Sequence, residues 1–315
     1  MGGPGTGAAD RPWARHRPRA QLLADRYPFA ASVLGLYAAL IDVWEEGWDL
    51  LREERPDPAQ LPLWTVERIV PEVVKATEAA GPQPLADAMA DLVAAGGLED
   101  VLTAWLAGDE LPAFERFLAR ASLTAPLVAL GEDAGAACLG EPSARGGRRC
   151  QRCGAAPQLS FRIQTGEGLV SGGRHLVCSR CSHDWVHSAS ACPSCGETAG
   201  SQRTVFAEPQ GGSAVRGFEP GDFVRRPRRG KASSEVGAPI DVPPSVPPSV
   251  PPSLPSMFPH LRVDACATCE RYVIDVDLGR DPLAVPEVDE LAAIPLDLYA
   301  NERRFSKITP NLMGF

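Results

Sequence analysis

The most uneven feature of the 315-residue sequence is its lack of lysine. Only Lys75, Lys231 and Lys307 are present, so almost all positive charge is arginine, and the net charge is −9. A protein whose main partner is nucleic acid needs a concentrated basic face. The charge balance therefore argues against nucleic acid as a partner. Alanine, glycine and proline are abundant beside arginine, which indicates a compositional bias and lowers the weight of arginine clusters as functional signals.

Long hydrophobic runs are also missing. The longest run, residues 29–41, is interrupted by Ser32. A helix that crosses a bilayer needs about 20 apolar residues, so this run predicts a buried helix and no membrane insertion. The first residues lack the apolar stretch of a secretory or twin-arginine signal. We therefore expect a cytoplasmic protein.

Cysteine, in contrast, is plentiful and regularly spaced. Structural disulfides are rare in cytoplasmic proteins. Eight of the nine cysteines form four C-x-x-C pairs: Cys150/Cys153, Cys178/Cys181, Cys192/Cys195 and Cys266/Cys269. The ninth, Cys138, follows an apolar helical segment and is predicted to be a buried small hydrophobic residue.

The first half of the chain is predicted to be entirely α-helical. Residues 1–18 are rich in glycine, proline and arginine and are predicted to be disordered. Apolar residues then recur at three- and four-residue steps, without the period of two that marks strands. We expect a helix start near Thr65 and a kink at Pro71. The predicted helical domain spans residues 19–140.

The second half changes to short strands separated by turns. The alternating pattern predicts strands at 158–163, 175–177, 185–187, 204–206 and 272–276. Strands this short bury little core, and small folds of this kind are commonly stabilised by a metal. Residues 208–256 hold RRPRRGK and a repeated VPPS motif. We interpret this segment as a linker insertion with polyproline character and a solvated charge run.

The predicted fold class is a multi-domain chain that combines α-helices with small β modules. The helical domain is followed by two modules of the rubredoxin-like or zinc-ribbon-like type, at residues 141–191 and 192–285. The second module carries the insertion at about 208–256. Residues 286–315 are predicted to form a C-terminal helix, broken near Pro295, and a tail.

The C-x-x-C spacing is typical of a metal-binding turn. Two cysteines three positions apart can direct both sulfurs at one ion, and a second such turn completes a tetrahedral site with four thiolates. Gly154 and Gly196 follow two of the turns and suit their tight backbone. Ser182 and Glu270 stand at the same place in the other two turns and are less typical there.

The spacings favour pairing the turns in sequence order. Between Cys153 and Cys178 lie 24 residues, which suits a ribbon of two strands. Between Cys195 and Cys266 lie 70 residues, and about 21 remain once the insertion is removed. This scheme predicts a first site at Cys150, Cys153, Cys178 and Cys181 and a second at Cys192, Cys195, Cys266 and Cys269. Trp185 would then pack at the junction of the two modules.

Other arrangements stay open on these grounds. The two central pairs, only ten residues apart, could form one site and leave the outer pairs to share another. Redox dithiols of the thioredoxin type fit less well, because these occur singly at the start of a helix. His175, His183 and His187 could replace a thiolate but are expected to lie outside the ligand set. Spacing does not distinguish iron from zinc.

The chain resembles the FdhE family, the accessory proteins of formate dehydrogenase. The resemblance covers most of the chain: a helical first half, C-x-x-C-G at 150–154, C-x-x-C at 178–181 followed by Trp185, and C-x-x-C at 192–195 and 266–269. Three features depart from the family pattern. Val186 stands after Trp185 where relatives carry histidine, Ala189 and Ser190 stand where relatives carry arginine shortly before the third pair, and residues 208–256 are inserted.

The resemblance implies a function in enzyme assembly. It implies two rubredoxin-like iron sites at the eight paired cysteines, with zinc as the alternative. Such a protein is not the dehydrogenase and not an enzyme. It acts in the cytoplasm on the large catalytic subunit before that subunit is exported. A zinc-ribbon module that binds nucleic acid or protein through purely structural metals is the alternative. The motif RRPRRGK and the arginines near the first turn favour that alternative, and the net charge opposes it.

Overall fold

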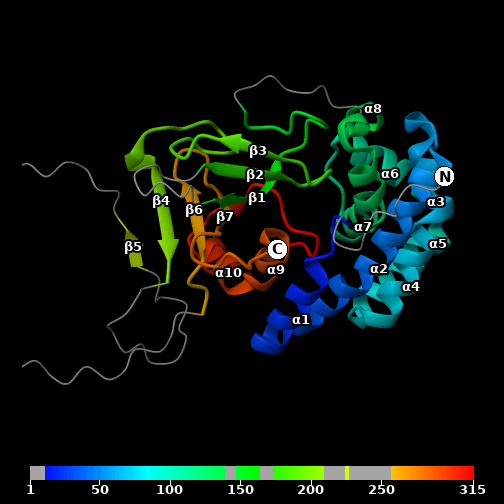
Figure 1. Cartoon of the computed structure of the whole chain (residues 1–315), viewed down its shortest axis with the longest axis horizontal. Coiled ribbons are helices and arrows are strands. Elements are labelled where there is room, and N and C mark those ends of the chain that lie inside the picture. Colours follow the sequence, from blue (N-terminus) through cyan, green and yellow to red (C-terminus); the bar gives the residue numbers. More distant parts are fainter. Residues whose placement is uncertain (1–10, 139–146, 164–172, 209–223, 227–256) are drawn as a thin grey trace, which may run out of the picture.

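The chain folds into a helical part and a sheet part that share one hydrophobic core (Figure 1). The computed structural model describes residues 11–138, 147–163, 173–208, 224–226 and 257–315. The helices lie at one end, the sheet lies at the other, and the last two helices cover the sheet next to α1. This arrangement confirms the predicted fold class of an α-helical first half followed by a small β region.

The helical part is built around one long central helix. Helix α2 (Ala31–Glu54) buries nine residues, and its Trp44 donates a hydrogen bond to the carbonyl of Ala121 at 2.7 Å. By length and composition alone, residues 28–54 could cross a membrane, but 44% of the tested window is buried inside the protein. The other helices are α1 (His16–Arg26), α3 (Leu61–Arg68), α4 (Val70–Ala80), α5 (Gln83–Ala95), α6 (Leu98–Ala107), α7 (Ala113–Leu130) and α8 (Ala134–Ala137).

Part of the segment predicted to be disordered is ordered. Residues 1–10 lie outside the described residues, but helix α1 already begins at His16. Trp13 is buried, and its ring lies 5.8 Å from that of Trp44. The glycine- and proline-rich composition did not predict this order. A single large aromatic side chain can bury enough surface to order a short polar segment, and composition gives little weight to one residue.

Two prolines lie in the first turns of helices, although the sequence predicted a later helix start near one of them and a kink at the other. Helix α3 begins at Leu61 with Pro62 in its first turn, four residues before the expected start. Pro71 lies in the first turn of α4 and does not kink a continuous helix. Proline is tolerated at this position because the first N–H groups of a helix have no intrahelical partner.

The β region is one continuous sheet. Its strand order is β3-β2-β1-β7-β6-β4-β5, with β8 paired to β7 off this path. The strands are β1 (Pro157–Arg162), β2 (Arg174–Cys178), β3 (Asp184–His187), β4 (Arg203–Ala207), β5 (Val224–Arg226), β6 (Leu261–Cys266), β7 (Arg271–Asp277) and β8 (Ser306–Lys307). The five predicted strands correspond to β1, β2, β3, β4 and β7.

The two halves of the sheet join through one parallel pair. Strands β1, β2 and β3 form an antiparallel ribbon, and β4, β6 and β7 form another. Strand β1 then pairs in parallel with β7, with Leu159 opposite Ile274. The two predicted modules therefore share a sheet. The proposed division into domains at specific residues stays a prediction.

The insertion contains a short strand that the sequence did not predict. Strand β5 pairs antiparallel with β4, with Val205 opposite Arg226. Its residues include the first arginines of RRPRRGK, so part of the predicted linker insertion is a strand. Residues 209–223 and 227–256, which hold the VPPS repeats, lie outside the described residues.

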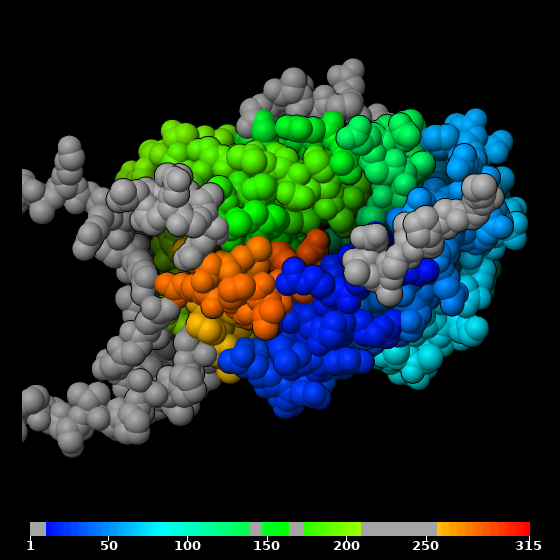
Figure 2. Space-filling model, in the orientation of Figure 1, coloured from blue at the N-terminus to red at the C-terminus, as the bar shows by residue number. Residues whose placement is uncertain are grey.

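The C-terminal segment packs between the two parts of the molecule. Helices α9 (Pro286–Ala292) and α10 (Ile294–Glu302) are separated at Ala293, close to the break expected at Pro295. Helix α9 contacts α1, α2 and β1. Figure 2 shows the N-terminal helix, in blue, lying against the C-terminal segment, in orange. Short 3-10 turns occur at Pro28–Ala30, Pro58–Gln60, Gly131–Asp133 and Gly200–Gln202.

Candidate metal centres

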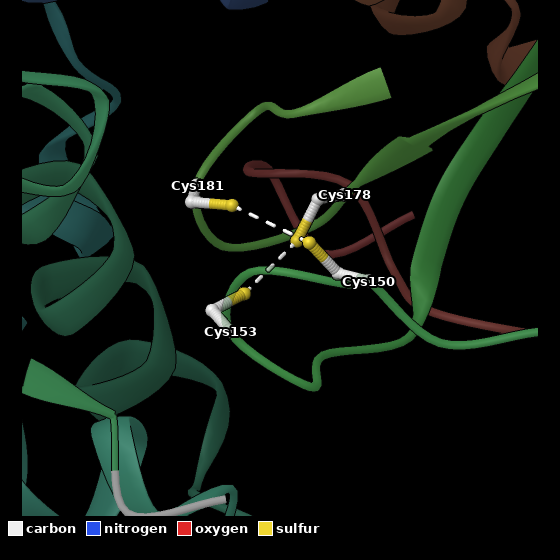
Figure 3. A group of neighbouring side chains, drawn as sticks. All are labelled: Cys150, Cys153, Cys178 and Cys181. Atoms are coloured by element: carbon white, nitrogen blue, oxygen red, sulfur yellow. Dashed lines mark hydrogen bonds between the residues drawn. The ribbon is translucent and has the colours of Figure 1, made fainter. Parts of the chain in front are cut away.

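Four thiols meet where the first ribbon folds back on itself (Figure 3). The sulfur of Cys150 lies 3.6 Å from that of Cys181, and the sulfur of Cys153 lies 3.3 Å from that of Cys178. All four residues are buried and none forms a disulfide. We call this group cluster 1. It unites the turn before β1 with the turn after β2.

A second group of four thiols occupies the matching place in the second ribbon. The sulfurs of Cys192 and Cys269 are 3.8 Å apart, as are those of Cys195 and Cys266. We call this group cluster 2. The structure thus brings together the same two sets of four cysteines that pairing in sequence order gives, and it does not unite the two central pairs.

All four turns share one backbone feature. The residue after the second cysteine has a positive φ in each turn, and these residues are Gly154 (72°), Ser182 (53°), Gly196 (84°) and Glu270 (54°). In two turns the N–H of this residue bonds the carbonyl of the first cysteine at 3.0 Å, from Gly154 to Cys150 and from Gly196 to Cys192. The turn therefore does not require glycine, although glycine adopts it with less strain.

Backbone N–H groups point at the sulfurs and stabilise thiolates. The N–H of Arg180 lies 3.4 Å from the sulfur of Cys178, and the N–H of Ser194 lies 3.4 Å from that of Cys192. Burial raises the pKa of Cys192 to about 12. Burial also disfavours the thiolate of Cys266, but backbone N–H groups outweigh it and lower the pKa of that thiol. Thiols this close share negative charge, which a cation would relieve.

The donor set fits a tetrahedral metal. A zinc or iron ion held at about 2.3 Å by four sulfurs places those sulfurs about 3.8 Å apart. The two sulfur–sulfur distances of 3.8 Å in cluster 2 match this value, and those of cluster 1 are slightly shorter. Both clusters could therefore hold a metal ion, and four-sulfur coordination suits iron and zinc alike.

The two clusters differ in their exposure to solvent. In cluster 1 the exposed fraction of each cysteine is 4% or less. In cluster 2, Cys195 and Cys269 are partly exposed, while Cys192 and Cys266 are buried. The cysteines of cluster 1 belong to the shared hydrophobic core, whereas those of cluster 2 do not.

The nearby histidines lie outside both ligand sets. His175 bonds Asp184 at 2.8 Å, and His187 bonds the carbonyl of Gly147 at 3.1 Å. The ring of His183 stacks on that of Trp185. Trp185 itself lies on the edge strand β3 and donates to Gly147 at 2.6 Å. It does not lie at the junction of the modules, because the ribbons join through β1 and β7.

Cys138 is buried as predicted, and it also touches cluster 1. Its thiol hydrogen-bonds Cys153, and this contact together with burial raises the pKa of Cys138. A fifth thiol thus lies directly outside the set of four.

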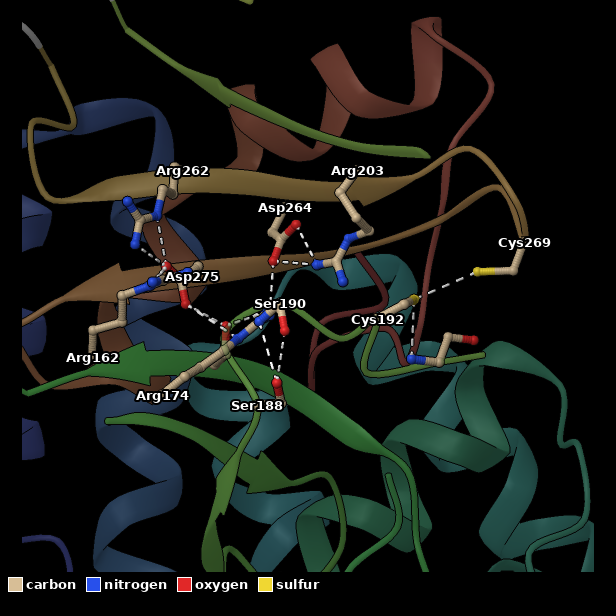
Figure 4. A network of polar contacts seen from close by, with 12 residues as sticks. Arg162, Arg174, Ser188, Ser190, Cys192, Arg203, Arg262, Asp264, Cys269 and Asp275 are labelled. Atoms are coloured by element: carbon tan, nitrogen blue, oxygen red, sulfur yellow. Dashed lines mark hydrogen bonds and ion pairs between the residues drawn. The ribbon is translucent and has the colours of Figure 1, made fainter. Parts of the chain in front are cut away.

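Sequence reasoning missed a buried network of charges that crosses the sheet (Figure 4). Asp264 on β6 pairs with Arg203 at 2.6 Å and with Arg174 at 2.9 Å. Asp275 on β7 accepts a hydrogen bond from Arg162 at 2.8 Å and one from Arg262 at 2.6 Å. Charged residues at inward positions of strands were the signal that could have revealed it.

The arginines around Asp275 keep its carboxylate charged. Burial alone would raise its pKa, but the surrounding arginines outweigh burial and lower the pKa to about 2. The network links the first ribbon to the second and ends at Arg203, which lies opposite Cys266 in the register of β4 and β6. It thus connects the sheet core to cluster 2.

A third group of possible ligands is an ion-pair cluster. His260, Asp281 and Asp289 offer ligand atoms within 4.8 Å of one another. The guanidinium of Arg19 already bonds both carboxylates, at 2.9 Å to Asp289 and 2.6 Å to Asp281. Arginine therefore supplies the positive charge that a metal would supply.

Comparisons with known proteins agree with this geometry. No family model matches the chain. A curated protein of Aquifex aeolicus described as "Protein FdhE homolog" is 26% identical over 166 residues, which are 53% of this chain and 41% of that relative's length. The crystal structure of the FdhE protein from Pseudomonas aeruginosa is similar with a TM-score of 0.56 and 21% identity, and the match covers 96% of this chain and 94% of that one. The resemblance to the FdhE family is therefore confirmed, in sequence over half of the chain and in fold over almost all of it.

Proposed function

We propose that the chain is a cytoplasmic accessory protein for the assembly of formate dehydrogenase, and that it binds the catalytic (large) subunit of that enzyme before export. The observation that carries this proposal is the pair of four-cysteine clusters fused into one sheet behind a helical domain, in a fold like that of an FdhE protein. The sequence match to an FdhE homolog supports the same function.

The eight cysteines are proposed to be metal ligands. Cys150, Cys153, Cys178 and Cys181 would hold one ion, and Cys192, Cys195, Cys266 and Cys269 the other. Iron is the proposed metal, with zinc as the alternative. Iron bound by four thiolates can exchange one electron, whereas zinc is redox-inert. The chain's own contribution is the turn backbone, which fixes the sulfurs and stabilises them as thiolates.

We assign the chain no catalytic reaction of its own. Four sulfurs complete a tetrahedron and leave no open position, and catalytic metal sites keep one position free for water or substrate. The clusters thus have the composition of structural or electron-transfer sites. Binding to the dehydrogenase subunit is the activity that remains to be measured.

Co-purification tests the proposed partner. The tagged full-length chain and the untagged catalytic subunit are expressed together, and the subunit keeps its export signal. The two proteins should be recovered as a complex at physiological salt. A periplasmic oxidoreductase subunit of similar size and charge serves as the control. If the catalytic subunit elutes no more strongly than this control, the proposed function is wrong.

Metal analysis tests the two sites. The parent protein should contain two metal ions per chain, and an iron form should be red, whereas a zinc form should be colourless. Cys178→Ser and Cys266→Ser should each retain one ion. Cys138→Ser should retain both, because its thiol lies outside the ligand sets. Loss of both ions from either cluster variant would contradict the assignment of two independent sites.

A further inference from the structure

A cleft of about 740 Å³ opens beside cluster 1. Three parts of the molecule line it: the loop between α6 and α7, the two turns of cluster 1, and the C-terminal tail with Arg271 on β7. This volume is typical of a ligand site, which commonly measures about 300–1,000 Å³. No function proposed for the metal clusters accounts for the cleft.

Four arginines line this cleft, and none of them has a carboxylate partner among the described residues. Arg116, Arg149, Arg180 and Arg271 all contribute to its walls. Within the described part of the chain, no aspartate or glutamate oxygen lies within 4.0 Å of any of the four. The carboxylates on the rim, Asp109 and Glu110, are exposed and form no ion pair there.

Some arginines elsewhere in the described residues pair with carboxylates, such as Arg17 with Asp42 and Arg162 with Asp275, and others, such as Arg26, do not. The cleft differs in that four arginines without such a pair line one hollow. The whole chain carries a net charge of −9. A group of arginines that bond carbonyls and not carboxylates, in one cleft of an acidic protein, attracts an anionic ligand.

One of the four arginines is held rigidly at the base of the cleft. The exposed fraction of Arg180 is 9%, and its Nη1 donates to the carbonyl of Leu106 at 3.2 Å. Its guanidinium carbon lies 5.6 Å from the centre of the Trp105 ring. The Nε–H of Arg180 is buried and has no hydrogen-bond partner. The base of the cleft is thus pre-organised and carries an unused donor.

An open strand edge forms another wall. In the part of the chain that the structure describes, strand β8 (Ser306–Lys307) pairs with β7 alone. The N–H groups of Ser306 and Ile308 bond toward β7, at 2.8 and 2.9 Å. Because backbone groups alternate along a strand, the N–H of Lys307 between them points to the other side. Open edges of this kind accept an extended peptide as an added strand.

We infer that this cleft binds an extended acidic peptide segment of the protein partner, with the peptide backbone along β8 and its carboxylates on Arg116, Arg149 and Arg271. The identity of that partner as the dehydrogenase subunit rests on the proposed function. The shape of the site and its charge rest on the residues named above.

The cleft favours a peptide over a nucleic acid. Asp109 and Glu110 stand on the same rim as the arginines. A continuous chain of phosphates would meet these carboxylates, whereas a peptide has a neutral backbone and can place its carboxylates only opposite the arginines. Guanidinium groups also bind carboxylates through paired, directional hydrogen bonds.

Fluorescence anisotropy with a defined probe tests the inference. The probe is a labelled ten-residue peptide of alternating glutamate and valine, and the comparison peptide has lysine in place of glutamate. The full-length parent should bind the acidic probe and not the basic one, with an affinity that falls as salt is added. Arg116→Glu and Arg149→Glu, on two different walls, should each weaken binding by about ten-fold or more.

Arg26→Glu is the matched control. It makes the same charge change at an exposed arginine on α1, outside the cleft. It should leave the affinity for the probe nearly unchanged. All variants are compared in unfolding temperature and metal content, so that a misfolded variant is recognised. The inference is overturned if the parent does not bind the acidic probe, if Arg26→Glu weakens binding as much as the cleft variants, or if a ten-nucleotide single-stranded RNA binds more tightly than the peptide.

Failure of this inference and failure of the proposed function have different signatures. If the acidic probe binds in the cleft but the catalytic subunit does not bind the chain, the proposed partner is wrong, while binding of an acidic peptide in the cleft is supported. If the catalytic subunit binds the parent, Arg116→Glu and Arg149→Glu equally well, the proposed function stands and the cleft is not the contact.

Discussion

At the scale of single residues, the metal turns depend on one backbone position. The residue after the second cysteine of each pair is in the left-handed region, whether it is glycine or not. Left-handed backbone costs an L-residue about 1–2 kcal/mol, and glycine avoids this cost. Two turns use glycine, and the other two carry Ser182 and Glu270 with some strain. These positions therefore allow opposite predictions within one cluster.

Gly196→Ala and Glu270→Gly should change stability in opposite directions. An added Cβ at Gly196 meets only the Arg148 side chain at 3.5 Å, so the cost is backbone strain of about 1 kcal/mol. Glu270→Gly relieves strain, and the greater flexibility of the unfolded chain offsets part of that gain, leaving about 0.5 kcal/mol. Urea unfolding of the metal-loaded proteins measures both. Equal destabilisation by the two substitutions would contradict the argument.

At the scale of secondary-structure elements, the C-terminal helices and tail are held by buried charges. Lys307 on β8 pairs with Glu290 on α9 and with Asp297 on α10, and Tyr272 donates to Asp297 at 2.8 Å. Glu290 also accepts from Gln158 on β1, which in turn is bonded by Arg120 on α7. One polar chain thus connects the helical part, the sheet and the tail.

Asp297→Asn should change how stability depends on pH. Burial raises the pKa of Asp297 to about 6, an effect that Lys307 partly offsets. The folded protein therefore keeps a proton that the unfolded chain releases, so this stabilising contribution is complete below about pH 4 and is lost as pH rises through about 6. Asparagine does not titrate, so the stability of the variant does not fall in this way as the pH rises.

Urea unfolding of parent and variant between pH 4 and 7 measures the effect. The unfolding free energy of the variant minus that of the parent should rise with pH, by up to about 3 kcal/mol. Because metal release at low pH affects both proteins, the difference isolates the carboxyl group. A difference that stays constant or falls with pH would show that Asp297 does not titrate in this range.

The unequal exposure of the clusters predicts two rates of metal release. Cys195 and Cys269 give a chelator access to cluster 2, whereas all four cysteines of cluster 1 are buried. With a colorimetric chelator in excess, the metal-loaded chain should release one ion roughly ten-fold faster than the other, since solvent access controls such sites. Cys178→Ser should leave only the fast phase and Cys266→Ser only the slow phase. If Cys178→Ser left only the slow phase and Cys266→Ser only the fast phase, local opening of the structure, and not static exposure, would govern metal release.

At the scale of the whole molecule, the two ends of the chain are joined by a buried ion pair. Arg19 on α1 is 270 residues away from Asp289 on α9, and the exposed fractions of their side chains are 8% and 1%. His260 also bonds Asp289, at 2.7 Å. This contact fixes α1 on α9, which itself packs on β1.

Arg19→Ala should be far more damaging than Arg17→Ala. Removing Arg19 takes the guanidinium partner from the buried Asp289 and leaves only its contacts with His260 and the N–H of Val285, which costs about 3–5 kcal/mol. Arg17 lies two residues earlier in the same helix, and its pair with Asp42 is exposed, so its loss should cost about 0–1 kcal/mol. Thermal and urea unfolding compare the two variants directly. Similar costs for both would show that the Arg19 cluster relaxes or hydrates when it is broken.

The sequence by itself determined the four C-x-x-C turns and the class of the fold. The C-x-x-C turn is a local structure, and the lengths of chain between turns favoured the two groups of four thiols, although a site made from the two central pairs stayed open until the structure brought the turns together. The helical first half and the five expected strands followed from periodicity, which is also local. These features needed no knowledge of contacts between distant residues.

Only the tertiary structure decided how these parts are joined. The parallel pairing of β1 with β7, the burial of Trp13 and the contact of Arg19 with Asp289 depend on residues far apart in the sequence. The unpaired arginines of the cleft likewise became visible only when their neighbours were known, because an arginine in a sequence carries no sign of whether a carboxylate lies beside it. Local patterns set the elements, and the balance of buried area and charge between distant segments set their arrangement.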